Sequence, residues 1–269
     1  VVQVRLGSVT IVKQWSDGAD RHADDSVTVQ LQRKAIGASA GAENVGDPIT
    51  LNAGNKWTAT VDHLVPGYTY SVAEVSGGDR YDVSYEGNDT DLTKKMVWSA
   101  DTDTATITTT IVNTLKTSAL TNAITVKKNL TGRDWKSSDT FDFTLDAQDG
   151  APLPSGCGKQ LCTVTVNAGS RDHSATFGSI TYSAGNATYT YFVTENSGSI
   201  NALHYSQAKY KVVVTVAKND AGAWTASVTS VTKVTDDGGN VVSESRDVTQ
   251  PVDFTNHYIA VSALPLTGG

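Results

Sequence analysis

The sequence is poor in the features that mark several large classes of protein. Its 269 residues include two cysteines, one methionine and no run of about 18 apolar residues that would form a membrane-spanning helix. It also lacks a signal peptide, so we expect a soluble chain that is a mature or trimmed fragment. Lysine and arginine number 21 against 28 aspartates and glutamates, and the two signs are interspersed. A formal net charge of −7 without a clustered basic face argues against nucleic acid as the partner.

The residues that are abundant favour β-structure. Threonine, valine and tyrosine fit a pleated, half-buried surface and are frequent throughout the chain. Apolar and polar residues alternate in many short runs, such as 27–31, 141–145 and 210–214, whereas no helical period of useful length occurs. Clusters of glycine, aspartate, asparagine and serine separate these runs and mark turns. The pattern predicts an all-β chain of immunoglobulin-like antiparallel β-sandwiches.

A short motif occurs twice and indicates two tandem modules. The motif YTYxVxE spans residues 68–74 and again residues 189–195. Each copy follows a lysine-bearing run, VTIVKQW or ITVKKNL, and precedes a run that ends in asparagine, TIVN or DFTN. We predict modules over residues 1–117 and 118–260, followed by a tail over 261–269. The connection TLKTSALTN is short and polar, so we expect a stiff, extended rod.

The strand period points one lysine, one glutamate and one asparagine into each predicted core. Residues i and i+2 of a strand lie on the same face. Each of these polar residues stands two positions from an apolar residue that is expected to face inward. The two sets are Lys13, Glu74 and Asn113 in the first module and Lys128, Glu195 and Asn256 in the second.

Ionisable groups inside a small sandwich need a physical reason, because burying a charge is costly even when it is paired. Burial lowers the pKa of lysine and raises that of glutamate, which gives a neutral amine beside a protonated carboxyl group. The amine can attack the side-chain amide of asparagine while the glutamate polarises the carbonyl and moves a proton, and ammonia leaves. The ordinary alternative is a lysine that reaches water and an asparagine in a turn. The complete set in both modules favours single-turnover Lys–Asn isopeptide formation, with the glutamates as catalytic groups.

The two cysteines leave two interpretations open. Cys157 and Cys162 lie in the stretch APLPSGCGKQLC, with four residues between them. A local disulfide suits an oxidising location. A zinc site is the rival, but it needs two further ligands, and the five histidines show no paired metal-ligand spacing. We favour the disulfide and expect no metal and no cofactor.

The runs that carry these residues resemble two domain families of Gram-positive surface proteins. Residues 8–117, with VTIVKQW, SVTVQLQR, YTYSVAE and IVNT, resemble a Cna B-type repeat. Residues 119–260, with KNLTGRDW, FDFTL, YTYFVTEN and DFTNHY, resemble the pilin isopeptide-linkage domain. The resemblance implies two tandem Cna B-type sandwiches, and it assigns the two Lys, Glu and Asn sets to crosslinks.

The last residues of the sequence resemble the LPxTG sorting motif. The motif consists of Leu264, Pro265, Leu266, Thr267 and Gly268. The resemblance implies that a sortase cleaves between Thr267 and Gly268 and links the threonine to an amine of peptidoglycan or of a pilin subunit. The apolar segment and basic tail that follow this motif in the family are absent, so we expect a chain that was cut here. We predict a secreted, cell-wall-anchored protein of the extracellular surface.

The leading functional hypothesis is a stalk, part of a pilin or adhesin that holds a more distal region away from the wall. The alternative is an adhesin module that binds a host glycan or matrix protein through aromatic residues such as Tyr205 or Trp224. An enzyme has no support from an acid–base pair or triad apart from the crosslinking groups. A polymerising shaft pilin would offer a lysine in a Tyr-Pro-Lys type motif, and the sequence contains none. Its absence favours a wall-anchored adhesin or a basal or minor pilin.

Overall fold

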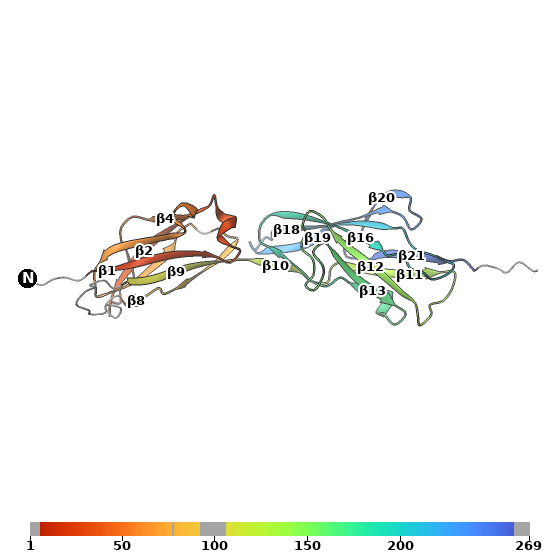
Figure 1. Cartoon of the computed structure of the whole chain (residues 1–269), viewed down its shortest axis with the longest axis horizontal. Helices are drawn as coiled ribbons and strands as arrows, with labels where there is room; N and C mark the ends of the chain where they lie inside the picture. The colour runs from red at the N-terminus through yellow and green to blue at the C-terminus, as the bar shows by residue number, and fades with distance from the viewer. Residues whose placement is uncertain (1–5, 77, 92–105, 261–269) are drawn as a thin grey trace, which may run out of the picture. The chain divides into compact units, whose positions relative to one another are not determined.

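The computed structural model describes residues 6–76, 78–91 and 106–260, and it divides the chain into two compact units between Lys116 and Thr117 (Figure 1). The secondary structure of these residues consists of β-strands and three short 3-10 helices. The predicted all-β class is confirmed. None of the described residues belongs to a helix that is long and apolar enough to cross a membrane.

The first unit is a sandwich of two sheets. One sheet has the strand order β5-β1-β9-β7, and the other has the order β3-β2-β6-β8, with β4 also paired to β2. Its strands are β1 (Gly7–Trp15), β2 (Ser26–Ala35), β3 (Glu43–Asn44), β4 (Ile49–Asn52), β5 (Thr58–Leu64), β6 (Tyr68–Glu74), β7 (Tyr81–Glu86), β8 (Thr90–Asp91) and β9 (Thr106–Leu115). Its 3-10 helices are η1 (Ala19–His22) and η2 (Ala53–Asn55).

The second unit has two main sheets and a small one. The main sheets have the orders β14-β11-β21-β17 and β13-β12-β16-β18-β19-β20, and β10 pairs with β15. Its strands are β10 (Thr117–Leu120), β11 (Thr125–Thr131), β12 (Thr140–Ala147), β13 (Leu161–Asn167), β14 (Ser174–Thr176), β15 (Ile180–Ser183), β16 (Ala187–Glu195), β17 (Leu203–His204), β18 (Lys209–Lys218), β19 (Trp224–Thr235), β20 (Val241–Arg246) and β21 (Val252–Tyr258). The 3-10 helix η3 (Arg171–His173) precedes β14.

Each unit contains one parallel strand pair, which the strand pattern did not predict. The first long strand pairs with the last one, β1 with β9 and β11 with β21, and the other pairs are antiparallel. Parallel neighbours need a long crossover connection. Here the remaining strands of each unit form that connection, so the two ends of the unit lie side by side in one sheet.

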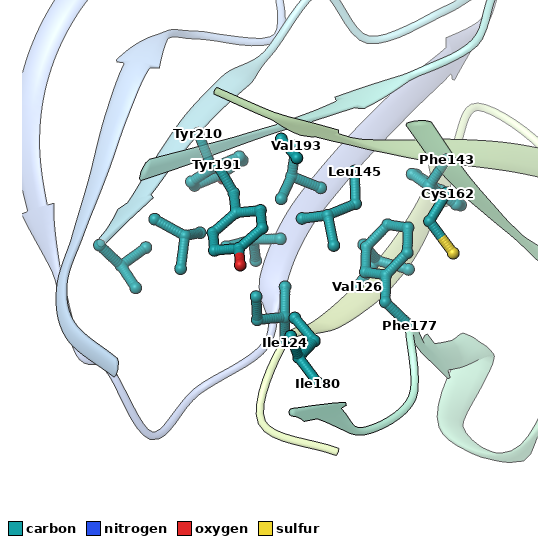
Figure 2. Close-up of a cluster of buried hydrophobic side chains, with 14 of the residues drawn as sticks. Ile124, Val126, Phe143, Leu145, Cys162, Phe177, Ile180, Tyr191, Val193 and Tyr210 are labelled. Atoms are coloured by element: carbon teal, nitrogen blue, oxygen red, sulfur yellow. The ribbon is translucent and has the colours of Figure 1, made fainter. Parts of the chain in front are cut away.

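Apolar side chains fill the space between the sheets of each unit, as the strand period predicts. In the first unit Val9 and Ile11 of β1 meet Val29 and Leu31 of β2, and all four are 0% exposed. Figure 2 shows the core of the second unit. There, Val126 of β11 packs with side chains from β12, β16 and β18, and this core includes Phe143, Leu145, Val193 and Tyr210. The same inward faces also carry polar side chains, two residues further along the strand. Lys13 follows Ile11 in this way, and Lys128 follows Val126.

Candidate functional site

Each unit brings its predicted lysine, glutamate and asparagine together at one place between its sheets. The lysine and the asparagine lie on the parallel pair, whereas the glutamate ends a strand of the facing sheet, β6 in the first unit and β16 in the second. We call these sets the first cluster (Lys13, Glu74, Asn113) and the second cluster (Lys128, Glu195, Asn256). The sequence places them there because strand alternation turns all six side chains inward.

The strand register is the same in both units. Lys13 pairs with Ile111, and Asn113 is the second residue after that partner. Lys128 pairs with Phe254, and Asn256 is again the second residue after the partner. Because residues two apart share a face, each asparagine side chain points to the same side as its lysine.

The first cluster is buried but incompletely hydrogen-bonded. The Lys13 and Glu74 side chains are 0% and 1% exposed, and Lys13 Nζ lies 3.6 Å from Glu74 Oε2. The ammonium donates instead to the Gln14 main-chain oxygen at 3.1 Å. Asn113 Nδ2 donates to Glu74 Oε1 at 3.0 Å. Glu74 Oε2 and Asn113 Oδ1 are buried without a hydrogen-bond partner among the described residues.

A cleft adjoins the first cluster. Its volume is about 640 Å³, and its walls include Trp15, His22, Glu74 and Tyr81. Such a volume holds several water molecules, each of which occupies about 30 Å³ in the liquid. The Trp15 ring lies between this cleft and the lysine, with Lys13 Nζ 4.1 Å from the ring centroid. Water therefore has a route to the edge of the first cluster.

The second cluster is buried, and each of its side-chain polar atoms has a hydrogen-bond partner. Lys128 Nζ donates to Glu195 Oε2 at 2.8 Å, and both side chains are 0% exposed. Asn256 Nδ2 donates to Glu195 Oε1, also at 2.8 Å. The remaining acceptor, Asn256 Oδ1, receives the main-chain N–H of Ser206 at 2.7 Å. The Phe141 ring covers the lysine, with its centroid 5.0 Å from Nζ.

The electrostatic environment shifts both lysines and Glu195 toward their neutral forms. Burial lowers the pKa of Lys13 and the pKa of Lys128 from 10.5 to about 8, although the neighbouring glutamate opposes the shift in each case. Burial raises the pKa of Glu195 above its usual value, against the opposing effects of Lys128, Asn256 and the Ser206 main-chain amide. These directions are the ones that a neutral amine beside a protonated carboxyl group requires. Each cluster can therefore hold a nucleophile, a proton carrier and an amide electrophile at one site, and that of the first cluster adjoins the cleft.

Two family models match the chain. Residues 124–259 match the Spy0128-like isopeptide containing domain, and residues 9–114 match the Cna protein B-type domain. The first of these matches covers half of the sequence. The chain belongs to the family of Spy0128-like isopeptide containing domains. Both matches are to structural modules of pilin and surface-protein type, so the chain is a pilin-type protein of the Gram-positive extracellular surface.

Solved structures that match the chain include repeats of a collagen binding protein, a major pilin and a pilus adhesin. Two B repeat units of the collagen binding protein of Staphylococcus aureus are 16% identical, with a TM-score of 0.46, over 95% of this chain and 76% of that one. The major pilin from Streptococcus pyogenes is 14% identical, with a TM-score of 0.24, over 96% and 99%. The pilus adhesin SpaC from Lactobacillus rhamnosus GG is 12% identical, with a TM-score of 0.30, over 95% of this chain but 29% of the adhesin. This chain therefore spans less than a third of that adhesin's length. No curated protein sequence matches the chain.

The Spy0128-like domain contains the second cluster and both cysteines. Cys157 and Cys162 form a disulfide on the edge of the second core, where Cys162 is 6% exposed. No group of three His, Cys, Asp or Glu side chains that could hold a metal ion occurs within residues 6–76, 78–91 and 106–260. The sorting-motif residues 264–268 lie outside the described residues.

Sequence reasoning missed the residues that surround the clusters. In the Spy0128-like domain these are Ser206 and Asp237, which lie in connections without periodic pattern. In the Cna B-type domain His22 stacks on Trp15, with ring centroids 3.7 Å apart, and both ring nitrogens contact aspartates. The aromatic residues considered for ligand binding, Tyr205 and Trp224, are partly buried and pack against the second core.

Proposed function

We propose that this chain is a stalk segment of a cell-wall-anchored Gram-positive surface protein or pilin. Two intramolecular isopeptide bonds stabilise it, one in each cluster. The observation that carries the proposal is the duplicated Lys, Glu and Asn set, whose side chains are buried in both units. In each unit the lysine and the asparagine lie on a parallel strand pair of the same register, and the glutamate lies on the facing sheet. Two independent sites with identical register and chemistry are difficult to explain as ordinary core packing, because buried ions cost stability.

The proposed reaction balances within each cluster. The neutral lysine amine adds to the side-chain carbonyl carbon of the asparagine, so that a C–N bond forms and the asparagine C–Nδ2 bond breaks. The glutamate carries one proton from the lysine nitrogen to Nδ2, which leaves as ammonia. The products are a secondary amide between the two side chains and a glutamate in its starting protonation state.

The position of the crosslinks suits a protein under tension. Lys13 and Asn113 belong to β1 and β9, the first and last strands of one sandwich. Lys128 and Asn256 belong to β11 and β21, the first and last strands of the main sheets of the other. A covalent bond between the two strands of each pair transmits a force applied to the termini directly from one strand to the other. The segments between the crosslinked residues are then not stretched. The crosslinked unit then resists extension, because its enclosed loop cannot lengthen.

Force spectroscopy on the whole chain tests this role. In the wild type we expect no extension of the segments between the crosslinked residues. Glu195→Gln keeps the side-chain shape but removes the proton carrier, so the second unit should extend by about its full enclosed length while the first does not. Glu244→Gln, an exposed glutamate of β20, is the matched control and should behave as the wild type. Full extension of both wild-type units at ordinary unfolding forces contradicts the proposal.

Sortase attachment is the second part of the proposal and rests on the sequence of residues 264–268. Cleavage of the Thr267–Gly268 amide transfers the threonine carbonyl to an amine of peptidoglycan or of another pilin subunit, and the residues from Gly268 onward leave with a free amine. Incubation with a purified sortase and a glycine-based amine should give the joined product. Thr267→Val should give none. A wild-type chain that stays unmodified with sortases of several classes contradicts this part.

A further inference from the structure

The side-chain oxygen of Asn256 has a main-chain donor that its counterpart in the first unit lacks. Ser206 N donates to Asn256 Oδ1 at 2.7 Å, and the two residues are 6% and 0% exposed. In the first unit Asn113 Oδ1 is buried and has no hydrogen-bond partner among the described residues. The two clusters therefore contain the same three reacting side chains but differ in what faces the asparagine oxygen.

That oxygen is where negative charge develops if an amine attacks the asparagine amide. As Lys128 Nζ adds to the carbonyl carbon, the C=O electron pair moves onto Oδ1, and it returns when the bond to Nδ2 breaks. A donor already aimed at this oxygen in a water-excluded site stabilises the charge without reorganising. A main-chain N–H suits this role because it neither titrates nor leaves the site.

Ser206 is held in place by the turn between β19 and β20. Its hydroxyl donates to Asp237 Oδ1 at 2.5 Å, and the next main-chain amide, Gln207 N, donates to the Asp237 carbonyl oxygen at 3.0 Å. These two bonds tie the connection between β17 and β18 to Asp237 at Ser206 and at the residue that follows it. The orientation of the Ser206 N–H thus depends on Asp237.

The same carboxylate also holds the strand that bears the asparagine. Thr255 N donates to Asp237 Oδ1 at 2.8 Å, and Thr255 directly precedes Asn256 in β21. Lys233 Nζ donates to Asp237 Oδ2 at 3.2 Å. Burial alone would raise the pKa of Asp237, but these donors and the Ser206 hydroxyl lower it, so the group is an anion at neutral pH. One ionised side chain thereby fixes the donor and the acceptor of the Ser206–Asn256 bond relative to each other.

We propose that the Ser206 main-chain amide is the oxyanion donor for the joining of Lys128 to Asn256, and that Asp237 is the positioning residue that holds this amide against the asparagine. The inference rests on the proposed crosslink. It adds a device that is specific to the second unit, because the first cluster offers Asn113 Oδ1 no such donor among the described residues.

Side-chain variants test the device, because each leaves Lys128, Glu195 and Asn256 unchanged. Asp237→Ala removes the carboxylate that holds both segments. Ser206→Ala removes the hydroxyl, which donates to Asp237 and accepts from Ala208 N, but it keeps the Ser206 N–H. Ser206→Thr restores the hydroxyl. Asp220→Ala, an exposed aspartate in the turn between β18 and β19, is the matched control.

The measurement is the rate of each crosslink in newly made full-length chain. Cell-free synthesis is stopped, samples are quenched with acid at intervals, and the joined peptides of both units are quantified by mass spectrometry after digestion. We expect Asp237→Ala and Ser206→Ala to slow the second crosslink about 10-fold, less than the roughly 100-fold cost of removing an oxyanion donor outright. Ser206→Thr and Asp220→Ala should keep the wild-type rate, and the first crosslink should keep its rate in every variant.

The outcomes separate this inference from the proposed function. If the wild type forms neither joined peptide, the crosslink proposal fails. If the wild type forms both, and Asp237→Ala and Ser206→Ala form the second at the wild-type rate, the crosslink stands and the positioning role is overturned. If Asp237→Ala does not fold, the comparison of Ser206→Ala with Ser206→Thr decides. If the contact of Ser206 with Asp237 only stabilises the fold, a folded Ser206→Ala chain should form the second crosslink at the wild-type rate. A Ser206→Thr chain as slow as Ser206→Ala also overturns the role.

Discussion

The two units present the same three side chains in the same register, yet among the described residues only the second cluster has a hydrogen-bond partner for each of its side-chain polar atoms. In the second cluster the lysine meets its glutamate at 2.8 Å, whereas in the first the corresponding atoms lie 3.6 Å apart. The parallel strand pair accounts for what the clusters share. Connections outside the strands account for the difference, because the described part of the first unit offers Asn113 Oδ1 no counterpart of Ser206 and Asp237. The comparison teaches that strand register brings the reacting groups together, and that loops decide how well they are held.

The largest expected effect is the loss of stability when either crosslink is prevented. Each bond closes a loop of about 100 residues or more, which stabilises the folded state by about 5 kcal/mol in the chain-entropy model. We expect Glu74→Gln to lower the free energy of unfolding of the first unit by about this amount, and Glu195→Gln to do so in the second. Guanidinium unfolding of each variant measures the change.

The control for this prediction is Glu86→Gln, an exposed glutamate of β7. It should leave the stability of both units within about 0.5 kcal/mol of the wild type. A loss in only one unit would break the symmetry between the clusters. It would mean that the other unit is not crosslinked.

The pH dependence of the crosslinking rate should be similar in the two units on the alkaline side. The reactive form of the pair is a neutral lysine beside a protonated glutamate, and the ion pair is a charged lysine beside an ionised glutamate. Both forms hold the same number of protons and differ only in which group carries the shared proton. Because burial lowers the pKa of both lysines to about 8, the pair loses this proton above about pH 8. The rate should then fall about 100-fold between pH 8 and pH 10.

On the acid side the second crosslink should slow when Glu195 and Lys128 are both protonated, since no free amine remains. Burial raises the pKa of Glu195, so this fall should begin at a higher pH than for an ordinary glutamate. Quenched time courses across the pH range measure both limbs. A rate that keeps rising above pH 8 would mean that deprotonation of the amine alone controls the reaction and that the glutamate proton is not needed.

The disulfide distinguishes the units more simply, since only the second contains cysteine. The bond between Cys157 and Cys162 closes a very short loop and should contribute about 2 kcal/mol in the same chain-entropy model. Reduction should lower the free energy of unfolding of the second unit by that amount and leave the first unit unchanged. Calorimetry with and without reductant measures this difference. An equal loss in both units would show that the reductant acts by another route.

The smallest expected effect is the difference between the two crosslinking rates. In the second cluster Lys128 already contacts Glu195, whereas Lys13 donates to the Gln14 oxygen and must approach Glu74 before the glutamate can take its proton. Misplacement of reacting groups by about 1 Å can cost up to about 100-fold, so we expect the second crosslink to form at least about 10-fold faster. The quenched time course of the wild type gives both rates. Equal rates would mean that the extra hydrogen bonds of the second cluster do not matter.

Strand alternation predicted much of the candidate site because it is a local property of the sequence. Lys13 and Lys128 stand two residues from buried valine and isoleucine in their strands, and burial of both side chains confirms the predicted inward orientation. The sandwich class followed from the same alternation together with the turn residues. The role of Lys13 and Lys128 in crosslinks stays a prediction.

Other features depend on contacts that no local pattern contains. The pairing of Lys128 with Phe254 joins strands more than 120 residues apart, and the alternation of each strand is the same for a parallel or an antiparallel neighbour. The contact of Ser206 with Asp237 links two turns through a hydroxyl and a carboxylate. In the sequence, serine and aspartate at such positions cannot be told from the polar residues that are common in any loop. Their role emerges only when both turns lie beside Asn256.

The central claim is that both clusters become covalent bonds, and the intact mass of the purified chain under reducing conditions tests it most directly. The account predicts a mass about 34 Da below that of the unmodified sequence, which is two ammonia molecules of about 17 Da each. Lys13→Ala and Lys128→Ala should each recover one of the two losses. A wild-type mass equal to that of the unmodified sequence would contradict the account, because the two clusters would then be buried ion pairs and not crosslinks.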